Sequence, residues 1–296
     1  MKKNGHYERA AEDLGNIVAL EHVNVLVPDQ HLATLFYVMG LGLTRDPYLM
    51  TGVTNMWINI GRSQFHLPVG EPQILRGRVG LVLPDLEALE ARLARFSDQL
   101  AGTEFSYAVD NSRGVVDVTS PWGNRIRCHA PDAAFGKVLL SMPYVELDVP
   151  AGAADGIARF YQEFLNAPAH VDEVDSAPAA RVSAGPDQQL VFRETDAPLA
   201  SYDGHHLQIY IADFSGPHGR LNERGLISEE SDQYQYRFQD IIDPANGDVL
   251  FTLEHEVRSM THPLYARPLV NRNPDQSNLA FAPGRETQAW AMPYSA

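Results

Sequence analysis

Three histidines lie in segments whose alternation of polar and apolar residues predicts β-strands. The segments are 21–27, 63–67 and 206–211, and the histidines are His22, His66 and His206. A neutral imidazole is a common ligand of divalent metals, but a single histidine on a strand is more often a structural residue. The chain has no Gly-rich phosphate loop, no Gly-x-Ser-x-Gly and no His-Glu-x-x-His motif, which excludes several common kinds of enzyme site.

Two further groups of polar residues are candidates for chemistry. Glu254, His255 and Glu256 follow one another near the last expected strand, and on their own they predict a solvated strand end. Arg78 and Arg127 lie on two other expected strands. A guanidinium binds carboxylate or phosphate through two parallel hydrogen bonds, so these arginines are either surface charges or a clamp for an anion.

The elements that carry these residues recur along the chain. Strand-to-turn segments begin near residues 22, 78, 144 and 206, with a helix and further strands expected between them. Landmarks of three kinds share one offset: His22 to Tyr144 spans 122 residues, Phe36 to Phe160 spans 124, and Gly123 to Gly247 spans 124. A shared offset across a strand, a helix and a turn predicts a duplicated half, each half made of two modules.

Composition narrows the class of protein. The chain has 296 residues and a net charge of −15, which argues against a nucleic-acid partner or an anionic membrane surface. Its one cysteine, Cys128, excludes a disulfide within the chain and fits the reducing cytoplasm. No apolar run approaches the ~20 residues of a membrane span, and no secretion signal is expected at the start.

The chain divides into four parts on this basis. We expect a lead-in at 1–19, domains at 20–130 and 141–258, and an extended tail at 259–296. Helices are expected near 30–40, 86–100, 153–166 and 217–226. Five prolines after residue 260 make a helix or central strand unfavourable there, so the tail should pack along the body or a partner subunit, which allows a homodimer.

Four βαβββ modules resemble the vicinal oxygen chelate superfamily, which includes glyoxalase I, bleomycin-resistance proteins and extradiol dioxygenases. The resemblance covers about residues 20–258 and depends on His22 at the start of the first strand, Phe36-Tyr37 in the first helix and the turn Pro121-Trp122-Gly123-Asn124. It implies an α+β fold in which the modules form two paired half-barrel domains, cup-like and with helices outside.

The resemblance also implies where metal ligands lie, namely at the start of a module's first strand and on its last strand. Carried over, these positions give His22, His66 and His206 as metal ligands, with Glu254 joining them if its strand bulges. They also give Glu254 and Tyr144 as catalytic candidates and Arg78 and Arg127 as substrate-binding candidates. An arginine cannot ligate a cation because its guanidinium stays protonated.

Two pairings of the modules remain open. Pairing within the first half places Arg78 and Arg127 beside the histidines, where fixed positive charges within ~5 Å of a dication would cost several kcal/mol. Pairing the first module with the fourth brings His206 to His22 and His66 instead. The first arrangement predicts a metal-free cup for an anionic ligand, and the second predicts a metal centre.

The expected function follows from the second pairing. We expect a divalent-metal-dependent enzyme, using Fe, Mn, Ni or Zn, that acts on a small oxygen-bearing substrate of the catechol-like or α-oxo type. The reaction would be that of a dioxygenase or of a glyoxalase-type lyase or isomerase. The alternative is a metal-free small-molecule-binding protein with an arginine-lined cup, as in bleomycin resistance.

Overall fold

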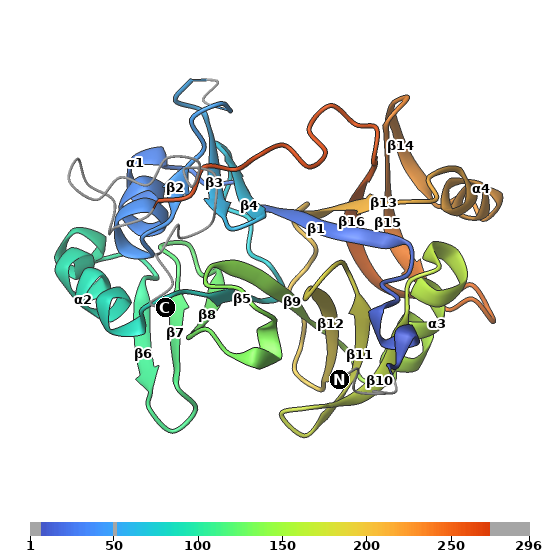
Figure 1. The fold of residues 1–296 in the computed structure, drawn as a ribbon, viewed down its shortest axis with the longest axis horizontal. Coiled ribbons are helices and arrows are strands. Elements are labelled where there is room, and N and C mark those ends of the chain that lie inside the picture. Colours follow the sequence, from blue (N-terminus) through green and yellow to red (C-terminus); the bar gives the residue numbers. More distant parts are fainter. Residues whose placement is uncertain (1–6, 50–51, 273–296) are drawn as a thin grey trace, which may run out of the picture.

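The computed structural model describes residues 7–49 and 52–272, and these form two eight-stranded mixed sheets (Figure 1). In sheet 1 the strand order is β14-β15-β16-β13-β1-β4-β3-β2. The strands of sheet 1 are β1 (Ile17–Asn24), β2 (Thr44–Arg45), β3 (Asn55–Ile60), β4 (Ser63–Pro68), β13 (His206–Ile211), β14 (Ile227–Asp232), β15 (Gln235–Ile242) and β16 (Val249–Ser259).

Sheet 2 repeats this plan with the order β10-β11-β12-β9-β5-β8-β7-β6. Its strands are β5 (Gly77–Val82), β6 (Ser106–Asp110), β7 (Val115–Thr119), β8 (Arg125–His129), β9 (Ser141–Pro150), β10 (Ala169–Val174), β11 (Ala177–Ser183) and β12 (Gln189–Thr195). In each sheet the two central strands are antiparallel and each pairs in parallel with the last strand of its own module. This arrangement confirms the predicted α+β fold of paired modules.

One helix accompanies each module and lies outside the sheets (Figure 1). The helices are α1 (Gln30–Ala33), which continues as π-helical turns over Thr34–Gly40, α2 (Leu86–Phe96), α3 (Ala154–Leu165) and α4 (Ser215–Glu223), with short 3-10 turns at Arg9–Glu12, Ser97–Leu100 and Ala133–Phe135. Asp29 and Asp85 cap the first two helices, because their carboxylates accept backbone N–H groups of the first turn. The long apolar face of α3 buries Phe160 and Leu165 against the strands.

The modules pair across the halves of the chain. β1 of the first module lies antiparallel to β13 of the fourth, and β5 of the second lies antiparallel to β9 of the third. Each sheet therefore takes strands from both 20–130 and 141–258, which is the second of the two pairings left open by the sequence. The repeat itself is visible in the matching strand orders of the two sheets, and the exact domain boundaries stay a prediction.

The described part of the tail packs on sheet 1. Asn271 accepts from the backbone N–H of Gly61 and donates to its carbonyl, and Arg267 donates to Asp46 at 2.8 Å. The segment 260–272 crosses from the end of β16 to the β3–β4 hairpin, as Figure 1 shows. The rest of the predicted tail, 273–296, lies outside the described residues. Within the described ranges, no helix is long and apolar enough to cross a membrane.

Candidate metal centre

A local irregularity in β1 places two neighbouring polar residues in the interior of sheet 1. The register between β1 and β13 shifts between Leu20 and His22, and both Glu21 and His22 are buried. Glu21 holds His22 directly, since the Glu21 Oε2 to His22 Nδ1 distance is 2.6 Å. This contact directs Nδ1–H of His22 toward the carboxylate and leaves Nε2 as the nitrogen with a free lone pair.

The three histidines predicted to converge do so. The ring centroid of His22 lies 5.6 Å from that of His66 and 5.9 Å from that of His206. His66 comes from β4 and His206 from β13, the two strands that flank β1 in the sheet. The cross-half pairing, favoured above by the argument from charge, is what brings His206 to the other two.

The atoms best placed to share an ion belong to His22, His206 and Glu256, one from each of three adjacent strands. One ligand atom from each lies within 4.8 Å of the others. Nε2 of both histidines is buried and has no hydrogen-bond partner among residues 7–49 and 52–272. Two atoms bound to one ion at 2.0–2.2 Å are about 3.3–3.6 Å apart in a tetrahedral site, so an ion would draw these side chains together by up to about 1.5 Å.

Glu256 is the ligand candidate that the sequence analysis missed. The cluster Glu254-His255-Glu256 is not a solvated strand end, because His255 and Glu256 are buried within β16. Alternation along the strand sends Glu254 and Glu256 toward the histidines, whereas His255 faces the core and contacts Tyr161 Oη at 2.6 Å. The alternation of side chains along a strand could have revealed it, because residues two apart face the same side. Glu256 therefore shares the face of Glu254 in a regular strand, with no bulge needed.

His66 lies beside this triad and not within it. Its ring stacks on Trp57 with centroids 3.7 Å apart, and its Nε2 is also buried and without a partner in the described part of the chain. Burial, followed by the proximity of the His22 imidazole, lowers the pKa of His66 to about 2. The same two causes lower the pKa of His206 to about 2. Both rings are therefore neutral, the form that a ligand or a hydrogen-bond acceptor requires.

Arginines balance the carboxylates around the centre. Arg237 donates to Glu254 and, at 2.6 Å, to Glu256, while Arg258 Nη2 lies 2.6 Å from the other oxygen of Glu256. Burial favours a raised pKa for Glu21, but the hydrogen bond with His22 and nearby guanidinium charges hold its pKa below the usual value. The carboxylate of Glu21 is thus kept ionised.

Glu254, one of the two predicted catalytic residues, lies at the centre. Its Oε1 is 3.6 Å from His206 Nδ1, and Gln239 donates to Oε2 at 3.1 Å. A carboxylate on the Nδ1 side of His206 favours the tautomer in which Nε2 can bind a ligand. Glu254 is therefore placed to position His206.

The other predicted site residues lie in sheet 2, away from the histidines. Tyr144 on β9 contacts His129 Nε2 at 2.9 Å, so the structure does not bring it to the metal centre. Arg78 donates to Glu146 at 2.7 Å, and Arg127 donates to both oxygens of Asp117. The expectation of one site containing both the histidines and these arginines is corrected: the cross-half pairing separates them into two cups.

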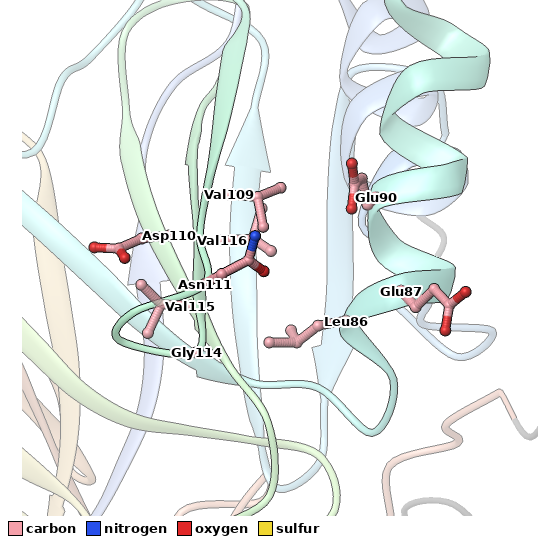
Figure 2. Close-up of a pocket in the computed structure, with 9 residues that line it drawn as sticks. All are labelled: Leu86, Glu87, Glu90, Val109, Asp110, Asn111, Gly114, Val115 and Val116. Carbon is pink, nitrogen blue, oxygen red and sulfur yellow. The ribbon is translucent and has the colours of Figure 1, made fainter.

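Two cavities lie on the sheet 2 side of the molecule. One, of about 260 Å³, lies between α2 and the β6–β7 hairpin, with Leu86, Val109 and the acidic Glu90 in its wall (Figure 2). The other, of about 450 Å³, lies over β5 to β8 and is lined by Arg78, Arg125 and Arg127. Neither is lined by a residue of the histidine centre.

Comparisons with known proteins find similarity in three-dimensional structure only. No protein-family model and no curated protein sequence matches the chain. Glyoxalase I from Zea mays superposes with a TM-score of 0.55 at 13% identity, covering 81% of this chain and 92% of that one. A candidate dioxygenase from Bacillus subtilis subsp. subtilis str. 168 superposes with a TM-score of 0.54 at 14% identity, covering 83% and 86%.

These superpositions cover more than four fifths of the chain. The chain has the fold of the vicinal oxygen chelate superfamily, and the resemblance inferred from the repeat is confirmed. At 12–14% identity the similarity carries the fold, and activity has to be argued from the site itself.

Proposed function

We propose that the protein is a divalent-metal-dependent enzyme acting on a small oxygen-bearing molecule, with the ion held by His22, His206 and Glu256. The observation that supports this most is the pair of buried, unpartnered Nε2 atoms facing a carboxylate within 4.8 Å. Buried polar atoms are nearly always paired, so two unpartnered imidazole nitrogens beside the Glu256 carboxylate favour a cation among them.

The donor set fits such an ion in charge as well as in geometry. The surrounding carboxylates are Glu21, Glu254, Glu256 and Asp46, and the surrounding guanidiniums are Arg237, Arg258 and Arg267, which gives four negative charges against three positive. With neutral histidines the centre carries a formal charge of −1, from 3 − 4. A dication is therefore not opposed by excess positive charge, despite the nearby arginines.

The chain's own residues have distinct tasks in this proposal. Glu21 orients His22, and Glu254 orients His206. His66 is too weakly basic to take up a proton near neutral pH, so it acts as a hydrogen-bond acceptor that orients a substrate hydroxyl. When bound, the ion would supply Lewis acidity toward two adjacent substrate oxygens and, if redox-active, reactivity with dioxygen.

The ligand types favour one reaction class over the other. Two histidines and one carboxylate form the donor set typical of non-haem iron oxygenases, which supports a dioxygenase-like reaction on a catechol-like substrate. Glyoxalase-type chemistry on an α-oxo substrate is the second option within the same class of site. Oxygen uptake with catechols, measured beside turnover of α-oxo adducts, distinguishes the two on Fe(II)- and Zn(II)-loaded protein.

A metal-free binding protein is the competing proposal, and one observation favours it. Both oxygens of Glu256 already contact guanidiniums at 2.6 Å, so this carboxylate has partners without an ion. Elemental analysis of protein purified without a histidine tag separates the two: the enzyme proposal expects a near-stoichiometric transition metal, and the competing proposal expects none.

We place the protein in the cytoplasm because its lone cysteine, Cys128, is buried and unpaired.

A further inference from the structure

Among residues 7–49 and 52–272, the cup of sheet 2 holds no cluster of metal-ligating side chains, but it has arginines on one face. Arg125 and Arg127 alternate on β8, so both face the same side, and Arg78 pairs directly with Arg125 in the parallel β5–β8 ladder. They line a cavity of about 450 Å³ together with Tyr107, Ser106 and Thr119. A cavity of this size falls in the range of small-molecule sites.

Each guanidinium is held by carboxylate or carbonyl oxygens and keeps one group free. Arg127 uses Nε and Nη2 on Asp117, and Arg125 uses Nε on the Gly77 carbonyl and Nη2 on Asp148. Arg78 uses Nη2 on Glu146 and Asp175. The Nη1 groups of all three donate to no residue in 7–49 and 52–272, and Nε of Arg78 is buried without a partner in those ranges.

The charge of this lining is unusual for the molecule. The chain carries a net charge of −15, yet the residues that line the cavity carry a formal charge of +2, from three arginines and Asp117. With the anchoring Glu146, Asp148 and Asp175 counted as well, the cluster carries −1, so the positive charge is on the cavity side only. Unpartnered guanidinium nitrogens also occur in other ion pairs of the described residues, but here three arginines that keep such a group line one cavity. Anchoring carboxylates that hold one edge of each guanidinium pre-organise the other edge for an incoming anion.

We propose that this cavity is a second ligand site, separate from the histidine centre, that binds a small organic carboxylate between Arg78, Arg125 and Arg127. The free Nη1 groups meet the carboxylate, and the ring of Tyr107 lies against the body of the ligand. The site does not depend on a metal or on the reaction proposed for sheet 1.

The test measures binding of 4-fluorobenzoate and its uncharged analogue 4-fluorobenzamide to the full chain by ¹⁹F NMR, at concentrations up to about 10 mM. The carboxylate should bind at least about tenfold more tightly than the amide, because charged hydrogen bonds carry the affinity. Arg127→Gln should weaken carboxylate binding about tenfold or more. Arg62→Gln, which removes an exposed arginine on the β3–β4 turn, should leave it unchanged.

Two further variants keep the result interpretable. Arg125→Gln leaves Asp148 paired with Arg193 at 2.5 Å, so it should fold normally and still weaken binding if Arg127→Gln proves unstable. His206→Ala should leave carboxylate affinity unchanged, which assigns binding to sheet 2 whether or not sheet 1 holds a metal. Equal affinity for acid and amide, no binding of the acid, or loss of binding in His206→Ala but not in the arginine variants would overturn the proposal.

Discussion

Replacing Glu21 with glutamine tests how the buried carboxylate next to His22 supports the metal centre. Glu21 is the hydrogen-bond partner of His22 Nδ1, at 2.6 Å, and is itself 4.0 Å from Arg258 Nη1. Glutamine preserves the size of the side chain and an acceptor oxygen, but it removes the negative charge. His22 then becomes a weaker electron donor through Nε2, and its ring orientation is less strongly fixed.

The size of the effect follows from the role of such carboxylates. Loss of an outer partner of a metal-binding histidine costs 10–100-fold in metal affinity, or about 1.4–2.8 kcal/mol. The change also leaves the nearby arginines Arg258 and Arg267 with one carboxylate fewer, which lowers cation affinity in the same direction. We therefore expect Glu21→Gln to bind Zn(II) at least about tenfold more weakly than the unaltered protein.

The assay is a competition titration of Zn(II) against a chromophoric chelator. Glu223→Gln is the matched control, because Glu223 is exposed at the end of α4 and far along the chain from the centre. Equal Zn(II) affinity for Glu21→Gln and Glu223→Gln would refute the assignment of Glu21 as the residue that positions His22.

Three further predictions concern stability, measured by urea unfolding. Burial lowers the pKa of His255 to about 4, so below its ordinary value of 6.5 the unfolded chain binds a proton that the folded chain does not. His255 should therefore contribute up to roughly 3 kcal/mol to the loss of stability between pH 6.5 and 4, beside the contributions of His66 and His206, and His255→Gln should lose that much less. An equal loss in His255→Gln and the unaltered protein would contradict this. Gly80→Ala puts a Cβ 2.3 Å from the Tyr144 ring and should lower the free energy of unfolding by about 1–3 kcal/mol. Gly219→Ala, in open space on α4, is the control and should not lower it. Equal stability of the two variants would show that the contact relaxes freely. Asn271→Ala removes the hydrogen bonds to Gly61 and should cost about 2 kcal/mol, and an unchanged midpoint would mean that the 260–272 segment adds no stability.

Much of the fold could be predicted because the chain repeats itself. The shared offset from Phe36 to Phe160 and from Gly123 to Gly247 reflects equivalent helices and turns in the two halves. Alternation of apolar residues predicted the inner strands, but it missed the four edge strands, β2, β6, β10 and β14, whose residues are mostly exposed or half-buried. An edge strand need not bury a face, so its sequence lacks the period of two.

Which modules pair could be inferred only from charge. Arg78 and Arg127 are incompatible with a cation site, and this argued against the pairing that places them beside His22. The exact ligand set could not be predicted from the sequence, because the irregularity in β1 that buries Glu21 beside His22 depends on the register with β13. The choice of Glu256 over Glu254 likewise depends on distances, because Glu256 has an oxygen within 4.8 Å of ligand atoms of both His22 and His206.

The central claim is that the two histidines, one on β1 and one on β13, hold one ion together with Glu256. Titration with Co(II), followed by its visible absorption bands, tests it most directly. We predict binding of about one ion per chain, retained in His129→Ala and weakened at least about 100-fold in His206→Ala. His129 is a fair control because it is a half-buried histidine of sheet 2 bonded to Tyr144. Absence of Co(II) binding by the unaltered protein, or unchanged binding by His206→Ala, would contradict the account.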